Sequence, residues 1–164
     1  MTLLLSSFDS PIGTLNLIAD EHVLLAANLS HVRALKESIS DEDSLREVTN
    51  VKRIPVITDL LQDYFDGDIS ALNSIKVRQP GAQFSQEAWK AMKKIRPGKT
   101  ISYAELAERA GSPAAVRAAG SACAKNAIVL VVPCHRIVKT GGSLGNYAYG
   151  LDKKEWLLRH EGAL

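Results

Sequence analysis

The feature that most limits the fold is a break in pattern at Arg78-Gln79-Pro80-Gly81. Before the break, residues 14–18 alternate between apolar and polar side chains, which is typical of a half-buried strand, and residues 23–29 can pair with them. After it the pattern is mostly helical, and Pro-Gly seldom lies inside a helix or a strand. We therefore predict an α+β protein, with a structural α/β domain over residues 1–79 and a mostly helical domain over residues 80–164.

The charge of the chain divides at the same place. Residues 1–79 hold seven Lys and Arg against twelve Asp and Glu, whereas residues 80–164 hold thirteen against six. The net charges are therefore about −5 and about +7, and the basic half is the one expected to meet a polyanion. Positive charge scattered over a solvated surface would give the same count, so both interpretations stay open.

The composition is that of a globular protein, with 46% hydrophobic and 23% charged residues. No apolar stretch approaches the roughly 20 residues that a membrane helix needs. The first six residues lack the basic segment that opens a signal peptide. We therefore expect a cytoplasmic protein with no membrane partner.

The first half shows no grouping of catalytic side chains, so we expect its role to be structural. Pro55 is placed to open a helix, and residues 72–77 are predicted to form a further strand. The apolar face of the helix after Pro55 holds Val56, Ile57, Leu60, Leu61 and Tyr64.

The second half carries the start and stop signals of three helices. Ser85 is predicted to cap the first, which would end at Pro97-Gly98. Ser102-Tyr103-Ala104-Glu105 has the form of a capping box. Ser112-Pro113 offers a cap and a first-turn proline for the third. Two short helices joined by about three residues predict a helix-turn-helix.

The third of these helices, over residues 114–125, consists almost wholly of Ala, Gly and Ser. Small side chains let a backbone approach another surface closely. One use is tight packing in a core, and the other is insertion into a DNA minor groove, where bulky side chains do not fit. In the second case Arg117 could project into the base stack, and otherwise it is a solvated surface arginine.

A possible nucleophile follows the apolar run of residues 128–132, which predicts a buried strand. The run ends at Pro133-Cys134-His135-Arg136. A thiol needs help to ionise at neutral pH, histidine can supply it, and an acid such as Glu161 can orient the histidine. Alternatively, Cys134 is a small buried hydrophobe. The only other cysteine is Cys123, so we expect no disulfide, and the spacing predicts no metal site.

Taken together, these motifs resemble those of the O6-alkylguanine-DNA alkyltransferases over essentially the whole second half. Pro133-Cys134-His135-Arg136 is similar to their active-site signature, and residues 101–107 are similar to the first helix of their helix-turn-helix. Ala115-Val116-Arg117-Ala118-Ala119-Gly120 is similar to their recognition helix. Asn126, Gly145-Asn146-Tyr147 and residues 154–162 are similar to the hinge, the binding loop and the C-terminal helix. In the first half, residues 10–13 and 61–67 resemble the family more weakly.

The resemblance implies an N-terminal ribonuclease H-like domain, a winged-helix-like second domain, and single-turnover repair without a cofactor. A base flipped out of duplex DNA would lose its O6-alkyl group irreversibly to Cys134, with O4-alkylthymine as a further substrate and no obligatory protein partner for a monomer. The catalytic residues that it implies are Cys134, His135, Glu161, Asn126 and Tyr103. Those implied to bind the minor groove are Arg117, Ala115, Val116, Ala118, Gly120 and Lys125, and those lining the base pocket are Tyr147, Ala148, Tyr149 and Ile137.

The sequence departs from the family at Tyr149, where glycine is common. We expect this side chain to narrow the base pocket and to favour methyl over benzyl groups. Cys123 replaces a larger apolar residue of some relatives, and we expect it to serve in packing.

Two other classes of protein fit parts of the pattern. A cysteine hydrolase could use Cys134, His135 and Glu161, but it would turn over and has no use for a small-residue helix carrying an arginine. A DNA-binding regulator would usually contact the major groove through larger polar side chains.

Overall fold

The computed structural model describes residues 2–164, which form two compact units. The first contains the described residues up to Pro80 together with Ala127–Val131, and the second contains Gly81–Asn126 and Val132–Leu164. None of the helices in the described part of the chain is long and apolar enough to cross a membrane.

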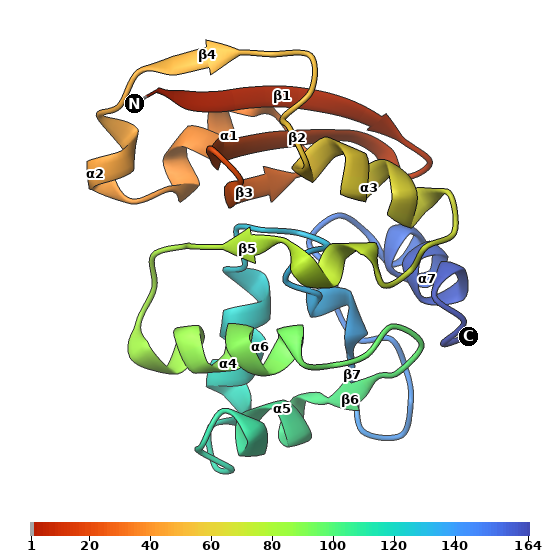
Figure 1. The fold of residues 1–164 in the computed structure, drawn as a ribbon. Helices are drawn as coiled ribbons and strands as arrows, with labels where there is room; N and C mark the ends of the chain where they lie inside the picture. The colour runs from red at the N-terminus through yellow and green to blue at the C-terminus, as the bar shows by residue number, and fades with distance from the viewer. Residues whose placement is uncertain (1) are drawn as a thin grey trace. The chain divides into compact units, whose positions relative to one another are not determined.

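The first unit is built on a five-stranded sheet in the order β4-β1-β2-β3-β5 (Figure 1). Strands β1 to β3 form an antiparallel meander, while β4 pairs parallel to β1 and β5 parallel to β3. The strands are β1 (Leu3–Ser10), β2 (Gly13–Asp20), β3 (Val23–Asn28), β4 (Val48–Asn50) and β5 (Lys76–Val77). The helical segments are α1 (Val32–Ser38), α2 (Asp41–Ser44), α3 (Ile57–Phe65) and a 3₁₀ turn at Ala71–Ser74.

Helices pack on the two faces of this sheet. Leu35 and Ile39 belong to one buried apolar cluster with Leu3 and Leu5 of β1. Successive side chains of a strand point to opposite faces, and on the other face Phe8 stacks on Phe65 of α3 with ring centroids 6.0 Å apart. The predicted pairing of β2 with β3 is confirmed, but residues 15–19 are all buried rather than half-buried.

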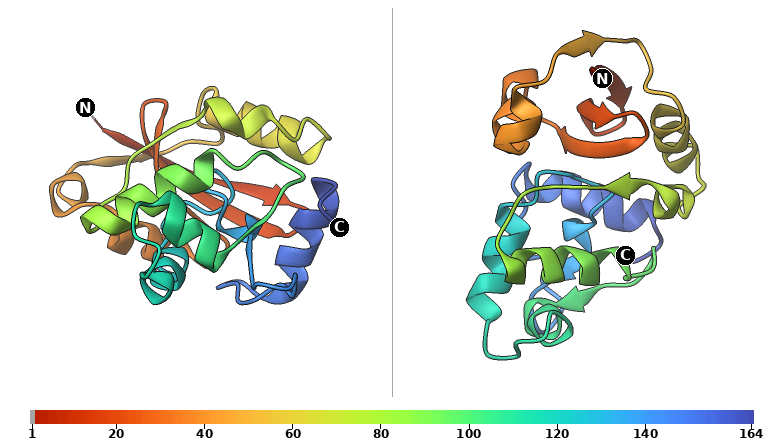
Figure 2. Two further views of the ribbon diagram at one scale, coloured as in Figure 1. Left: turned by 90° about the horizontal axis from the view of Figure 1, so that it is seen from below. Right: turned by 60° about the vertical axis from the view of Figure 1, so that its left-hand side comes forward.

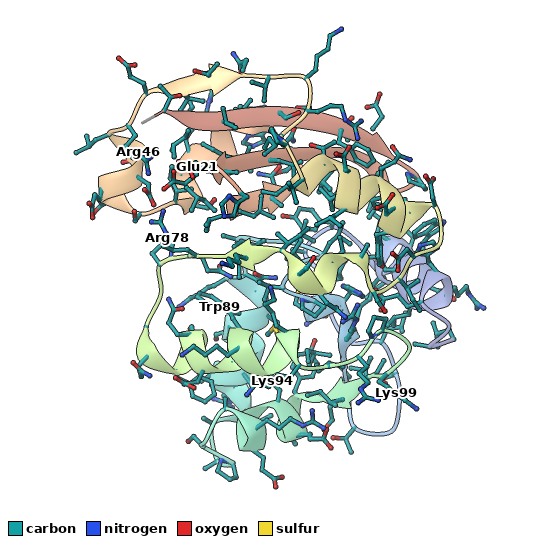
Figure 3. All side chains as sticks on the ribbon, viewed as in Figure 1. Glu21, Arg46, Arg78, Trp89, Lys94 and Lys99 are labelled. Atoms are coloured by element: carbon teal, nitrogen blue, oxygen red, sulfur yellow. The ribbon has the colours of Figure 1, made fainter. Side chains whose placement is uncertain are left out.

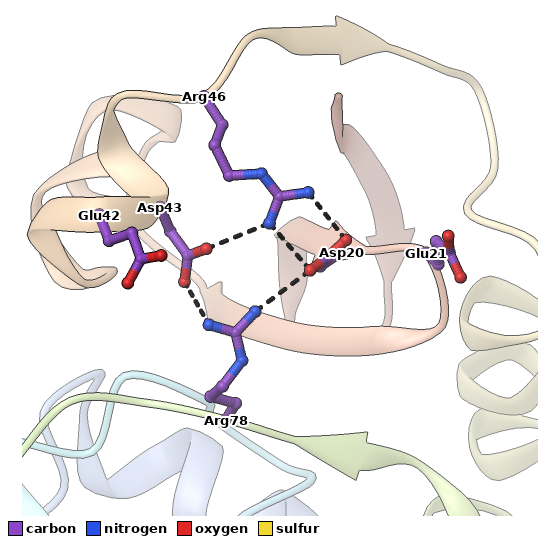
Figure 4. A pocket seen from close by; sticks show the side chains of 6 residues that line it. All are labelled: Asp20, Glu21, Glu42, Asp43, Arg46 and Arg78. Carbon is purple, nitrogen blue, oxygen red and sulfur yellow. Dashed lines mark hydrogen bonds and ion pairs between the residues drawn. The ribbon is translucent and has the colours of Figure 1, made fainter. Parts of the chain in front are cut away.

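Two arginines and two aspartates form a ring of ion pairs at the end of β2, where Asp20 lies (Figure 4). Arg46 bonds Asp20 at 2.8 Å and Asp43 at 3.2 Å, and Arg78 bonds the same two carboxylates at 3.2 Å and 2.6 Å. The hydrogen bond from Arg46 holds the pKa of Asp20 below its ordinary value. Arg78 directly follows β5 and lies at the break in the sequence pattern. Its ion pairs therefore tie the end of β5 to Asp20 and Asp43.

The second unit is mostly helical, as Figure 2 shows from two further directions. Helix α4 packs on α6, where the indole Nε1 of Trp89, labelled in Figure 3, donates to the Ala122 carbonyl at 2.9 Å. Helices α5 and α6 also pack together, in the order of a helix-turn-helix. The elements are α4 (Gln83–Lys93), β6 (Ile101–Ser102), α5 (Tyr103–Arg109), α6 (Val116–Ala124), a 3₁₀ turn at Cys134–Arg136, β7 (Ile137–Val138) and α7 (Leu151–His160).

The start of α5 agrees with its predicted cap, whereas the two neighbouring helices start elsewhere. Ser102 accepts from the Glu105 N–H at 3.0 Å, which confirms the capping box on its Ser side. Helix α4 begins before Ser85 and has no side-chain cap. Ser112-Pro113 lies in a turn in which the Ala115 N–H bonds the Ser112 carbonyl at 2.9 Å, so α6 begins only at Val116.

Three other predicted segments were wrong in part. Val56 precedes α3 with a φ of 70° and is 56% exposed, so it lies outside the apolar face. The strand predicted over residues 72–77 is limited to Lys76–Val77. Residues 128–132 are buried as expected but form no strand, because Leu130 has a φ of 74° and the Val131 N–H bonds the Val129 carbonyl in a tight turn. Only Ile128 bridges to a strand, at Ala27.

Candidate active site

Cys134 begins a 3₁₀ turn in the second unit and is half-buried. Its N–H bonds the Val132 carbonyl at 2.9 Å, and its own carbonyl accepts from the Ile137 N–H at the start of β7. The Asn126 amide donates to the Val132 carbonyl at 2.8 Å and also hydrogen-bonds the Cys134 side chain. Backbone hydrogen bonds therefore fix Cys134 on a tight turn rather than at the end of the predicted strand, and Asn126 contacts its side chain.

His135, the second residue of this turn, forms a buried pair with Glu161. The distance from His135 Nε2 to Glu161 Oε2 is 2.8 Å, and both side chains are fully buried. Arg136 completes the group, with Nε at 2.8 Å from Glu161 Oε1 and Nη1 donating to the Ile95 carbonyl at 2.7 Å. His135 Nδ1 is buried and has no hydrogen-bond partner within residues 2–164.

These contacts settle the charge states of the group. Burial opposes ionisation of Glu161, but His135 and Arg136 outweigh it and hold the pKa of Glu161 well below its ordinary 4.5. Burial lowers the pKa of His135 even though Glu161 opposes the shift. An ionised Glu161 can only accept, so a neutral His135 carries its proton on Nε2 and leaves Nδ1 as an unprotonated base.

Burial also acts on the thiol. It raises the pKa of Cys134, while the hydrogen bond from Asn126 and the charge of Lys154 act in the opposite direction. A neutral thiol is therefore favoured at rest, and a base is needed to take its proton.

The loop that contains Gly145 and Asn146 lies against Tyr103, the first residue of α5. The backbone of Asn146 hydrogen-bonds the Tyr103 phenol, and burial raises the pKa of that phenol. Gly145 has a φ of +76°, and a Cβ there would lie 3.0 Å from Tyr103 Oη, so glycine is needed for this close approach. Farther along the loop, Tyr147 and Tyr149 meet edge to face with ring centroids 5.8 Å apart. Ala148 between them is exposed.

Helix α6 presents a second candidate surface. Ala119 and Ala122 are buried, which supports the packing use of small residues on one face. Other positions along the helix are exposed, namely Arg117, Ala118 and the C-terminal cap residue Lys125, and Val116 is 41% exposed. A Cβ at Gly120 would meet no atom within 4 Å, so packing within the chain does not require glycine there.

The structure therefore brings Cys134, His135, Glu161 and Asn126 together, with Ile137 directly after the turn. Sequence reasoning gave no role to Arg136 or Lys154. Lys154 is fully buried on α7, on the same helical face as Leu157, Leu158 and Glu161. A lysine within an apolar stripe is the signal that could have identified it. No group of three or more His, Cys, Asp or Glu able to hold a metal ion occurs among residues 2–164.

Comparisons with known proteins match both the sequence and the fold. Residues 83–163 match the family model described as 6-O-methylguanine DNA methyltransferase, DNA binding domain. A methylated-DNA–protein-cysteine methyltransferase of Shigella flexneri is 43% identical over 108 residues, which are 66% of this chain and 63% of that protein. The enzyme of the same name from Methanosarcina acetivorans is 38% identical over 160 residues, which are 95% and 96% of the two chains.

A solved structure, Mycobacterium tuberculosis OGT in complex with DNA, superposes with a TM-score of 0.79 and 32% identity. The superposition covers 98% of this chain and 93% of that one. The second unit therefore combines a half-buried thiol, a buried His–Glu pair and two packed helices in the order of a helix-turn-helix. The chain belongs to the methylated-DNA–protein-cysteine methyltransferase family.

Proposed function

We propose that this protein repairs DNA by moving the alkyl group of O6-alkylguanine, and also of O4-alkylthymine, irreversibly onto Cys134. The observation that carries the proposal is the buried Nδ1 of His135, which has no hydrogen-bond partner among residues 2–164, while Glu161 holds the other ring nitrogen of this residue directly after Cys134. The likeness over nearly the full length to the Methanosarcina enzyme supports the same reaction.

In this proposal His135 takes the Cys134 proton through a water molecule. The thiolate attacks the alkyl carbon, so that a carbon–sulfur bond forms as the carbon–oxygen bond to guanine breaks. Tyr103 donates its phenolic proton to N3 of the leaving guanine, and its raised pKa keeps that proton in place until it is needed. The thioether has no further leaving group, so each molecule acts once.

The DNA partner would be a duplex approached through its minor groove by α6. The exposed small-residue face and the open space at Gly120 favour close contact with the groove. Arg117 would occupy the gap left by the flipped nucleotide, and Ala115 and Lys125 border the same helix. The division of roles would follow the two predicted domains, a ribonuclease H-like structural one over 1–79 and a winged-helix-like one over 80–164, in a cytoplasmic monomer.

The reaction is tested by mixing excess protein with a duplex that carries one O6-methylguanine. Trypsin releases residues 126–136, which contain Cys134 without Cys123. We expect this peptide to gain the mass of one methylene group with a stoichiometry of one per lesion, and Cys123→Ser to behave as the wild type. A restored duplex with an unmodified peptide, or several lesions repaired per molecule, would contradict transfer and favour a hydrolase.

Tyr149→Gly is expected to change the range of alkyl groups accepted. Removing the ring opens space beside Tyr147, with which it is in edge-to-face contact. We expect the rate with O6-benzylguanine to rise by about tenfold relative to the rate with O6-methylguanine. Steric selection between groups of different size in one pocket has about this magnitude. The measurement is the ratio of the two inactivation rates. The same ratio in Tyr149→Gly and in wild type would show that Tyr149 does not limit the size of the alkyl group that is accepted.

A further inference from the structure

Lys154 is a fully buried lysine that forms no ion pair with a carboxylate in the described part of the chain. Its Nζ donates to the Ile137 carbonyl at 2.6 Å and to the Asn146 carbonyl at 3.1 Å. Burying an ammonium group without a counter-charge is costly. An uncharged amide could donate hydrogen bonds to the same two carbonyls at a lower desolvation cost. The hydrogen bonds alone therefore do not account for a positive charge at this position.

The two carbonyls connect Lys154 to the reacting groups. The Ile137 N–H donates to the Cys134 carbonyl, so the residue whose carbonyl Lys154 binds is itself hydrogen-bonded to the turn that carries the thiol. The backbone of Asn146 also hydrogen-bonds the Tyr103 phenol. One ammonium group therefore fixes both the thiol turn and the loop that faces the proposed proton donor.

Among the ionisable groups that the structure describes near the thiol, Lys154 is the one whose positive charge is not paired with a carboxylate. Glu161 is neutralised by Arg136, and His135 is neutral. Asn126 contributes only a hydrogen bond, and Tyr103 and Cys123 are neutral at rest, since burial raises the pKa of both, that of Cys123 to about 12. When the thiol near this buried cation becomes an anion, the attraction between the two charges offsets part of the cost of burying both.

We propose that Lys154 is a positioning residue that holds the Ile137 and Asn146 carbonyls and whose charge stabilises the Cys134 thiolate formed before alkyl transfer. The inference rests on the proposed function for its purpose, but the charge coupling is measurable without DNA or substrate.

The first experiment measures the pKa of the Cys134 thiol in a Cys123→Ser background, from the pH dependence of its alkylation rate with iodoacetamide, followed on the tryptic peptide of residues 126–136. Lys154→Met removes the charge and keeps the shape, and Lys154→Arg restores a cation. We expect Lys154→Met to raise the pKa of the Cys134 thiol by about one unit and to slow its reaction with iodoacetamide at pH 7 by about tenfold. Lys154→Arg should recover most of both.

Lys153→Met is the matched control, because it removes the same charge from the adjacent, partly exposed residue of α7. It should leave the thiol pKa unchanged. A folded Lys154→Met protein with the wild-type thiol pKa would overturn the proposal, even if it reacted more slowly, because a purely structural lysine predicts that result.

A second measurement uses the wild-type side chain, in case the variants do not fold. In ¹³C-lysine-labelled protein, the pKa of Lys154 is followed by NMR before and after methylation of Cys134. Coupled charges require this pKa to fall when the thiolate is lost, and an unchanged value contradicts the inference. If the protein took no methyl group from a damaged duplex but methyl iodide still gave the shift, the proposed function would fail while the coupling held.

Discussion

Glu161→Gln should slow alkyl transfer by about a hundredfold, the loss expected when a catalytic base is no longer oriented. The amide keeps the shape of the carboxylate but can donate as well as accept, so it no longer fixes the proton of His135 on Nε2. Arg136 also loses the negative charge and one of the two oxygens that accept its hydrogen bonds, at 2.8 Å and 3.0 Å, while remaining buried. Breaking a buried ion pair in this way lowers the free energy of unfolding by about 3–5 kcal/mol.

Rapid quenching with damaged duplex gives the rate, and urea unfolding gives the stability. The pKa of Glu161 is lowered in the folded state, so its stabilising effect is complete above its ordinary 4.5 and is lost as the pH falls below that value. The stability gap between wild type and Glu161→Gln should therefore narrow in acid. Glu155→Gln on the same helix breaks only an exposed pair with Arg159 and should cost less than about 1 kcal/mol. A Glu161→Gln protein with wild-type rate would remove His135 from the proton path.

Local sequence signals predicted a helix start correctly where both partners of the capping hydrogen bond lie close together in the sequence. The Ser102 capping box was right because its bond spans three residues and depends on no distant partner. The Ser112-Pro113 signal failed, although its residues suit a helix start equally well. The chain instead makes a turn there, and α6, which packs on α4 and α5, begins only at Val116.

Burial was predicted more reliably than conformation. Residues 128–132 are buried, as their apolar run indicates, but Leu130 adopts a positive φ that no β-branched or apolar residue favours. Such a conformation persists only when surrounding contacts impose it. The run lies between Asn126, which binds the Val132 carbonyl, and the thiol turn. Tertiary contacts therefore override the strand propensity of the valines.

The active-site partners were predicted from family resemblance rather than from spacing. His135 is adjacent to Cys134, yet its strongest contact is with Glu161, 26 residues later. Nothing in the local sequence indicates that Arg136 would share that carboxylate or that Lys154 would be buried. Both depend on how α7 packs against the 3₁₀ turn, which is set by contacts distant in the chain.

Arg117→Ala should slow repair of O6-methylguanine in duplex DNA by about ten- to a hundredfold, while the reaction with the free base stays within about twofold. Holding a nucleotide out of the stack costs a few kcal/mol, and each 1.4 kcal/mol is worth about a factor of ten. Arg117 is exposed at the start of α6, and its side chain forms no hydrogen bond or ion pair with the other residues of 2–164 that the change would remove. Only a substrate that must be flipped should therefore respond to its removal. Single-turnover rates with the two substrates measure the difference.

Lys125→Ala separates a role in flipping from a role in binding. Lys125 is exposed at the other end of α6, and as a phosphate contact it should weaken binding to damaged and undamaged duplexes equally and reduce the salt dependence. Its duplex rate should return to the wild-type value at saturating DNA, whereas the rate of Arg117→Ala should stay low because the flipped state itself is destabilised. If saturation restored Arg117→Ala as well, the arginine would contribute affinity alone. Equal slowing on duplex and free base would instead mean that its loss disturbs the thiol site, and the small-residue helix would need another purpose.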